Sequence, residues 1–260
     1  MGHTLPQLET ILEDDELLVV MKPAGLPTAN APRGAPSVYA VVKQAMPAGA
    51  FLGVVSRLDA AVSGVLVLAK TRAAAADLSR QFRERSVEKA YGAVVEGRFP
   101  APLGQWVDWR DRIDRRGQER RSTLHRETSV DVHEADDEED SAGGRCHVRA
   151  RVVHRSGEVS LVELEPSTGR RHQLRVQLAG HGCPIVGDRV YGARLPFLAA
   201  IRSAIALHAR SLRLLHPATR RPLWLTADWP PAWSARFPGL PLRGAGLARD
   251  EDGRQAGRVN

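Results

Sequence analysis

The segment at residues 54–70, VVSRLDAAVSGVLVLAK, places two opposite charges inside an apolar stretch. Arg57 and Asp59 stand two residues apart, and valine- and leucine-rich runs flank them. An isolated charge in an apolar environment is strongly unfavourable, so such charges are either paired or used as reagents. A carboxylate beside a cation can act as a nucleophile or as a base. The spacing alone leaves a structural ion pair and a reactive carboxylate as alternatives.

The helices and strands around these charges are predicted from the spacing of apolar residues and from capping residues. The segment itself is predicted as strand, polar turn, strand, and Leu58 is expected to anchor the first strand in the core. Upstream, TILED and LLVVMK predict two short strands, a Pro- and Gly-rich loop follows, and Ser37 is expected to cap a helix. Downstream, Thr71 is expected to cap a helix over 72–85, and EKAYGAVVEGRF at 88–99 predicts a strand.

The second half of the chain is predicted to be richer in strands. HVRARVVHR and EVSLVELEP favour a strand pair around Ser156-Gly157, and ALHARSLRLLHP with RPLWLTADWP favours a final pair. STGRRHQLRVQLAGHG predicts a capped helix that ends at Gly180 and Gly182. Residues 133–144 are expected to be a solvated acidic hairpin tip. The predicted fold class is therefore α+β, with a large, mixed and mainly antiparallel sheet.

Composition points to a polyanionic partner in a reducing compartment. The chain has 260 residues, 43% of them hydrophobic, and a formal net charge of +7, which favours phosphate-rich partners such as RNA. The two cysteines, Cys146 and Cys183, lie far apart, which argues against a disulfide framework or a zinc site. The sequence shows neither a signal peptide nor a run of eighteen apolar residues, and it shows no Gly-rich phosphate loop. We therefore expect a cytoplasmic protein without a nucleotide cofactor.

Five motifs in order carry a resemblance to a known family. EDDELLVVMKPAGLP, SRLDAAVSGVLVLAK, EKAYGAVVEG, STGRRHQLRVQLAGHGCPIVGD and LHARSLRLLHP together closely resemble the RluA-type pseudouridine synthases, from about residue 10 to about residue 233. The resemblance implies one catalytic domain, taken as residues 10–240, after an N-terminal extension (1–9). Residues 241–260 are polar, Gly- and Arg-rich and nearly without large apolar groups, so we expect them to form a disordered tail. It also implies a bent sheet with flanking helices and a central active-site cleft. The implied activity is isomerisation of uridine in RNA without metal or cofactor.

The same resemblance assigns roles to three residues. Asp59, in R-L-D, matches the family's essential aspartate, which either attacks C1′ of the ribose or removes the 2′ proton so that a glycal forms. Arg175, in HQLR, matches the ion-pair partner of that aspartate. Tyr91, in KAYG, matches the tyrosine whose ring stacks on the uracil and whose hydroxyl is a candidate acceptor of the C5 proton. The choice between the two routes of Asp59 stays open.

Further positions are expected to contact the substrate, a structured rRNA or tRNA whose target uridine must leave its stack. These expected substrate-binding residues are Arg57, Lys89, Arg170 and His172. Arg57 suits a phosphate, and Lys89 shares a strand face with Tyr91 if the segment is extended. The protein is expected to act as a monomer, without a bound metal.

Several alternatives stay open at this point. The family usually reads H-R-L-D-x-x-T-S-G, whereas this chain has Ser56 and Val62 at the histidine and threonine positions. These departures motivate a non-catalytic RNA-binding or ribosome-assembly protein as the second hypothesis, and a hydrolase that releases free uracil is a third. The spacing of His172, His181 and Cys183 fits no common metal site. The Arg-rich segment 110–121 is either an RNA contact or a solvated face neutralised by its own acids.

Overall fold

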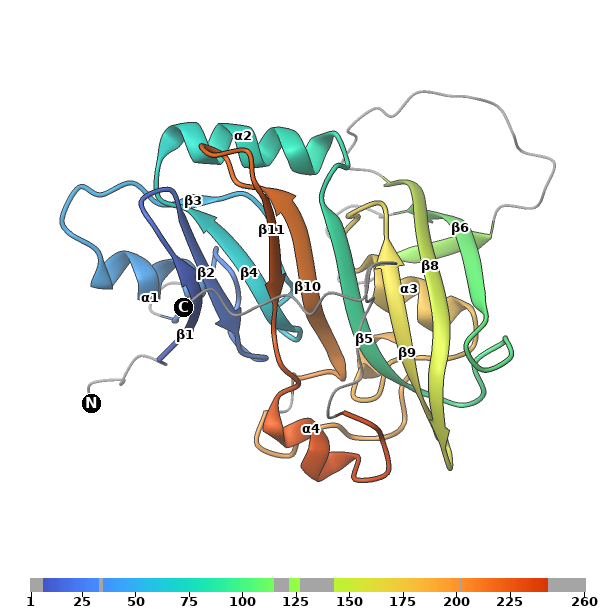
Figure 1. Cartoon of the computed structure of the whole chain (residues 1–260). Helices are drawn as coiled ribbons and strands as arrows, with labels where there is room; N and C mark the ends of the chain where they lie inside the picture. The colour runs from blue at the N-terminus through green and yellow to red at the C-terminus, as the bar shows by residue number, and fades with distance from the viewer. Residues whose placement is uncertain (1–6, 33–34, 115–121, 127–142, 202, 243–260) are drawn as a thin grey trace. The chain divides into compact units, whose positions relative to one another are not determined.

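The structure, a computed structural model, describes residues 7–32, 35–114, 122–126, 143–201 and 203–242 (Figure 1). The chain divides into two compact units. Unit 1 comprises the chain up to Ala90 and from His208 onwards, and unit 2 comprises Tyr91–Leu207. Most of the predicted acidic tip (133–144) and of the predicted tail (241–260) lies outside the described residues.

Unit 1 contains a sheet whose strands come from both ends of the chain. Its strands run in the order β1, β2, β4, β10, β11, and β3 also pairs with β4. Their bounds are β1 (Glu9–Glu13), β2 (Leu17–Lys22), β3 (Gly53–Val54), β4 (Ser63–Ala69), β10 (Leu207–Leu215) and β11 (Pro222–Thr226). β10 runs parallel to β4, and the other described pairs of this unit are antiparallel. The predicted strand pairs at 8–22 and at the C-terminal end are therefore confirmed.

Two capped helices cover the sheet of unit 1. α1 (Val38–Ala45) begins after Ser37, whose hydroxyl accepts the Ala40 N–H at 3.1 Å. α2 (Arg72–Arg83) begins after Thr71, whose hydroxyl accepts the Ala74 N–H at 3.0 Å. Both predicted N-caps are confirmed, and both satisfy a backbone donor that a helix leaves unpaired at its start. A short helix, α4 (Pro231–Arg236), was not predicted.

The two helices lie on opposite faces of this sheet, because β2 and β4 bury both of their faces. Odd-numbered residues of the two strands, such as Val19 and Val67, pack in one cluster with Leu78 of α2. Even-numbered residues, such as Leu66, pack in a second cluster with Val38 of α1. Successive strand side chains point to opposite faces, so a strand that is covered twice needs an uninterrupted apolar run. This explains the LLVV run of β2 and the VLVL run of β4, the second of which follows the charged segment.

Unit 2 is an antiparallel sheet with one helix packed against it (Figure 1). Its strands run in the order β5, β9, β8, β6, β7. Their bounds are β5 (Glu88–Glu96, within this unit from Tyr91), β9 (Val159–Pro166), β8 (Gly143–Ser156), β6 (Trp106–Asp114) and β7 (Thr123–Arg126). α3 (Gln173–Gly180) packs on β6 and β7, and a 3-10 turn, η1 (Arg189–Tyr191), lies against α3. The predicted strand pair around Ser156-Gly157 is confirmed. The predicted α+β class with a mainly antiparallel sheet is likewise confirmed.

The helix predicted from STGRRHQLRVQLAGHG begins later than expected. α3 starts at Gln173, and its N-cap, His172, has a left-handed backbone (φ 57°) and makes no side-chain cap bond. The Thr168 hydroxyl, which lies in the same motif, bonds the Gln173 side chain at 2.8 Å. Arg171 therefore precedes the helix. Residues 173–178 of α3 are buried.

None of the helices within the described part of the chain is both long enough and apolar enough to cross a membrane.

Candidate active site

Asp59 lies in the loop that joins β3 to β4, and it is half-buried. Arg57 in the same loop is exposed and Leu58 is half-buried. The prediction that Leu58 anchors a strand is wrong, because the strand before the loop ends at Val54. The apparent conflict of charges in an apolar segment is resolved here, since the apolar runs form strands while the charges lie between them.

The backbone on both sides of Asp59 is held by the loop that follows β2. Thr28 Oγ1 donates to the Leu58 carbonyl at 2.9 Å and accepts the Leu58 N–H at 3.1 Å. The Ala60 carbonyl accepts the Gly25 N–H at 2.7 Å, and the Asp59 carbonyl accepts the Val62 N–H at 3.0 Å. Each peptide group with a hydrogen bond to fixed structure loses conformational freedom, so Asp59 stands on a fixed stretch of backbone.

Lys22, at the end of β2, is fully buried beside this loop. Its ammonium donates to the carbonyls of Leu26 at 2.6 Å, Pro23 at 2.9 Å and Ala60 at 3.4 Å. Burial lowers the pKa of Lys22 to about 7, while attraction to Asp59 opposes that fall. Sequence reasoning did not assign Lys22 a role, although a lysine that ends an apolar strand in a lysine-poor chain was a usable signal.

Gly64 fixes where β4 departs from the Asp59 loop. It pairs with Ala209 in the parallel β4–β10 ladder and has φ +128°. A Cβ at this position would stand 2.2 Å from the Ala209 carbonyl oxygen. Beside it, the Ser63 hydroxyl and His208 Nδ1 are 2.8 Å apart, and both side chains are buried. Glycine is therefore required here both by backbone conformation and by space.

Lys89 and Tyr91 are both half-buried on β5, and they alternate with the buried Ala90 and Gly92. This pattern confirms that the two side chains share a strand face. Burial, and then the nearby charge of Arg85, lower the pKa of Lys89 to about 8. Two of the four lysines, the buried Lys22 and the half-buried Lys89, therefore have lowered pKa values.

Arg175 is buried in unit 2 and forms a bidentate ion pair that sequence reasoning did not predict. Its Nε lies 2.7 Å from Asp188 Oδ2, and its Nη2 lies 2.9 Å from Asp188 Oδ1. The guanidinium also lies over the Tyr191 ring, 5.1 Å from its centroid. Asp188 is 1% exposed, so this pair is almost wholly removed from water. The predicted grouping of Asp59 with Tyr91 and Arg175 stays a prediction.

The two other predicted positions of unit 2 lie just before α3. His172 Nδ1 is 2.9 Å from the Tyr191 hydroxyl, which also accepts the Ser122 N–H at 3.1 Å. Arg170 is half-buried, and its guanidinium lies against Gly144 of β8, where a Cβ would approach it to 2.7 Å. The structure thus brings His172 and Arg175 to the same tyrosine, a connection that no sequence period indicated.

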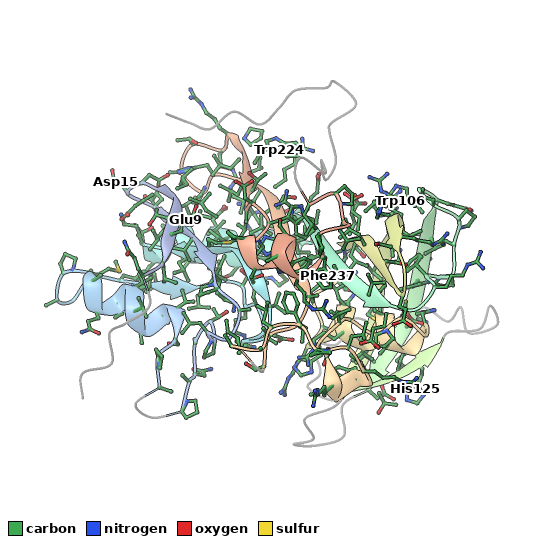
Figure 2. All side chains as sticks on the ribbon, turned by 90° about the horizontal axis from the view of Figure 1, so that it is seen from below. Glu9, Asp15, Trp106, His125, Trp224 and Phe237 are labelled. Carbon is green, nitrogen blue, oxygen red and sulfur yellow. The ribbon has the colours of Figure 1, made fainter. Side chains whose placement is uncertain are left out.

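The remaining sequence candidates, apart from Cys183, have structural partners. His181 Nε2 lies 3.2 Å from the buried Asp111 carboxylate, and its ring stacks on Trp109 at 3.9 Å. Cys183 is a free, buried thiol whose pKa burial raises to about 12. Arg112 pairs with Asp114 at 3.2 Å, which fits a self-neutralising face on β6, whereas residues 115–121 lie outside the described part. At the start of β6, Trp106 lies under the guanidinium groups of Arg149 and Arg151 (Figure 2).

Comparisons with known proteins identify the family of this chain. Residues 16–180 match the family described as RNA pseudouridylate synthase. The chain is 34% identical to the dual-specificity RNA pseudouridine synthase RluA of Haemophilus influenzae, over 82% of this chain and 90% of that protein. It is 35% identical to the ribosomal large subunit pseudouridine synthase D of Zymomonas mobilis, over 88% of this chain and 72% of that protein.

A solved structure supports the same relationship. The human RNA pseudouridylate synthase domain containing 4 superposes with a TM-score of 0.68 at 28% identity, covering 88% of this chain and 91% of that one. The matched residues include Asp59, Tyr91 and Arg175, and the sequence relatives extend over more than four-fifths of the chain. The chain therefore belongs to the RNA pseudouridylate synthase family, and it is an RluA-type enzyme that isomerises uridine in RNA to pseudouridine.

Proposed function

We propose that the Asp59 carboxylate carries out this isomerisation. It attacks C1′ of the target uridine, or it removes the 2′ proton so that a glycal forms, and either step breaks the N1–C1′ bond and frees the uracil before C5 joins C1′. The observation that carries the proposal is the setting of Asp59. The side chain is accessible in a loop whose neighbouring peptide groups are fixed, and its charge interacts with the buried Lys22 ammonium. A reactive group needs such pre-organisation to meet its substrate in one geometry.

Tyr91 and Arg175 complete the proposed machinery. The Tyr91 ring stacks on the uracil of the same uridine, and its hydroxyl takes the C5 proton in the last step. Arg175 keeps the Asp59 carboxylate ionised through its positive charge, while Asp188 fixes the orientation of the guanidinium by binding its Nε and Nη2.

The substrate is a structured rRNA or tRNA, in keeping with the names of the relatives, which refer to the ribosomal large subunit and to dual specificity. The target uridine swings out of its stack to reach the carboxylate. The exposed Arg57 binds a phosphate near that uridine, and Lys89, Arg170 and His172 make further contacts with the RNA. The enzyme works as a monomer in the cytoplasm. It uses no metal or cofactor, because the carboxylate is the reactive group in either route. Residues 10–240 form the catalytic domain.

Tritium release from RNA labelled at C5 of uridine tests the role of Asp59. Wild-type enzyme releases tritium and forms pseudouridine, whereas Asp59→Asn binds the same RNA with little change in melting temperature and releases none. Asp15→Asn, at an exposed aspartate of unit 1 (Figure 2), serves as the control and keeps full activity. Turnover by Asp59→Asn would refute the proposal. A large fall in its melting temperature would instead identify Asp59 as a structural charge.

A further inference from the structure

Thr28 stands between a helix and the Asp59 loop. It is 3% exposed, although the loop around it is rich in proline and glycine and connects β2 to α1. Its own backbone is fixed by the first turn of α1, since the Tyr39 N–H donates to the Thr28 carbonyl at 2.9 Å. The Val38 N–H donates in the same way to the preceding Pro27 carbonyl at 2.9 Å. The otherwise unpaired amides at the helix start therefore fix the position of Thr28.

The Thr28 hydroxyl makes two hydrogen bonds to the backbone of one residue, Leu58. Oγ1 accepts the Leu58 N–H at 3.1 Å and donates to the Leu58 carbonyl at 2.9 Å. Leu58 lies outside the sheet, so Thr28 supplies the two bonds that a neighbouring strand would give to a strand residue. The residue that follows is Asp59. One hydroxyl, 30 positions away in sequence, thus fixes both the N–H and the C=O group of the residue that precedes Asp59.

The other side of Asp59 is fixed by the same loop. The Ala60 carbonyl accepts the Gly25 N–H at 2.7 Å, and Gly25 has φ +90°, a conformation that favours glycine. Lys22 adds its ammonium at 3.4 Å. Ala60 would therefore stay in place if the Thr28 bonds were lost, whereas Leu58 would lose both of its described backbone bonds. Asp59 would then be tethered on one side only.

We propose that Thr28 is a positioning residue, which sets the direction of the Asp59 carboxylate by holding the peptide groups of Leu58. The inference rests on the proposed catalytic role of Asp59 and adds the device that orients it. Thr28 touches neither substrate nor carboxylate in this scheme, so it acts through the backbone alone. Removing the Thr28 hydroxyl leaves the fold and the RNA contacts in place, but it changes the direction of the Asp59 carboxylate. A misplacement of about 1 Å costs on the order of 100-fold in rate, which sets the expected scale.

The test compares kcat, KM and melting temperature across variants of the full chain on one labelled RNA. Thr28→Val keeps the shape of the side chain and removes both hydrogen bonds, and it is expected to lower kcat by roughly 10- to 100-fold with KM changed less than about threefold. Thr28→Ser restores the hydroxyl and is expected to restore most of kcat. If Thr28→Val does not fold, Thr28→Ala carries the same comparison.

Thr71→Val is the matched control, because Thr71 is another threonine of unit 1 whose hydroxyl binds backbone, in this case the Ala74 N–H. It is expected to lower the melting temperature comparably while leaving kcat unchanged. Equal kcat in Thr28→Val and wild type would overturn the inference, and so would a kcat loss that Thr71→Val reproduces. Turnover by Asp59→Asn would overturn the proposed function together with the inference. An inactive Asp59→Asn beside a fully active Thr28→Val would overturn the inference alone.

Discussion

Arg175 and Asp188 form a bidentate ion pair in the interior of unit 2, with both nitrogen–oxygen distances below 3 Å and both side chains less than a tenth exposed. Each charged group has lost most of its hydrating water, and the hydrogen bonds from its partner take the place of the bonds to that water. Breaking such a pair from one side leaves the other charge buried and uncompensated, which typically costs about 3–5 kcal/mol.

Asp188→Leu should therefore destabilise the protein by about 3–5 kcal/mol in urea unfolding. The double variant Arg175→Met with Asp188→Leu should recover much of that loss, because no unpaired charge remains. Pseudouridine formation separates the structural role of Arg175 from the catalytic one. If Arg175 acts on the reaction, the double variant stays inactive although it is folded. An active double variant would show that the arginine only holds Asp188.

The Gly64 position predicts a strong and specific loss of stability. Gly64→Ala places a Cβ 2.2 Å from a backbone oxygen that no rotamer change can move, and it does so at φ +128°. Overpacking and left-handed strain each cost about 1–3 kcal/mol, so a loss of about 2–6 kcal/mol is expected. Gly49→Ala is the matched control, since Gly49 has φ +81° and its added Cβ would meet nothing within 4 Å. Comparable losses in the two variants would contradict the steric argument.

Tyr91→Phe separates the two roles proposed for the tyrosine, stacking by the ring and proton transfer by the hydroxyl. The ring remains, so stacking on the uracil and RNA affinity should change little, whereas the proton transfer from C5 should slow. Rapid-quench analysis should then reveal an RNA species in which the glycosidic bond is broken and C5 still carries its hydrogen. Formation of pseudouridine at the wild-type rate in every phase would exclude the hydroxyl as the proton acceptor. Tyr39→Phe, in α1, provides a tyrosine control outside the proposed machinery.

Local sequence signals predicted the elements well and the site only in part. Ser37 and Thr71 could be identified as caps because a cap bonds an amide three residues away, within reach of a short motif. The two-sided burial of β2 and β4 was likewise visible as continuous apolar runs. In contrast, Thr28 reaches Leu58 across 30 positions and Arg175 reaches Asp188 across 13. Such pairs leave no period in the sequence, because topology alone brings them together.

The late start of α3 shows how a local signal can mislead. Thr168 precedes a helix, as a cap would, yet its hydroxyl is used by the Gln173 side chain. The chain between them turns through His172 in a left-handed conformation before the helix begins. The family resemblance identified Asp59, Tyr91 and Arg175 as candidates where propensity could not. It did not indicate Lys22 or Asp188, which are known here only from their contacts.

Lys22 should make stability depend on pH in the alkaline range. Its pKa is about 7 in the folded protein and about 10.4 when unfolded, so between these values the unfolded state binds more protons. The contribution of Lys22 to the free energy of unfolding therefore rises with pH through this window, by up to about 1.4 kcal/mol per unit. Urea unfolding of wild type and Lys22→Met from pH 7 to 10 should show a difference that grows in favour of wild type. A constant difference would mean that the buried lysine keeps its ordinary pKa.

His208 should also make the free energy of unfolding rise with pH, in this case in the acidic range. Burial lowers its pKa to about 3, while the Ser63 hydroxyl lies 2.8 Å from Nδ1 and the ring lies beside Trp229 and Trp233. An unfolded histidine has a pKa of about 6.5, so the stabilisation that depends on a neutral ring is complete above that value. It is lost as the pH falls from about 6.5 towards 3, by up to about 1.4 kcal/mol per unit, because the unfolded state takes up the proton first. His208→Gln cannot be protonated, so its stability should fall less steeply than that of wild type between pH 6.5 and 4. Parallel curves for the two proteins over that range would show that His208 is protonated within the fold.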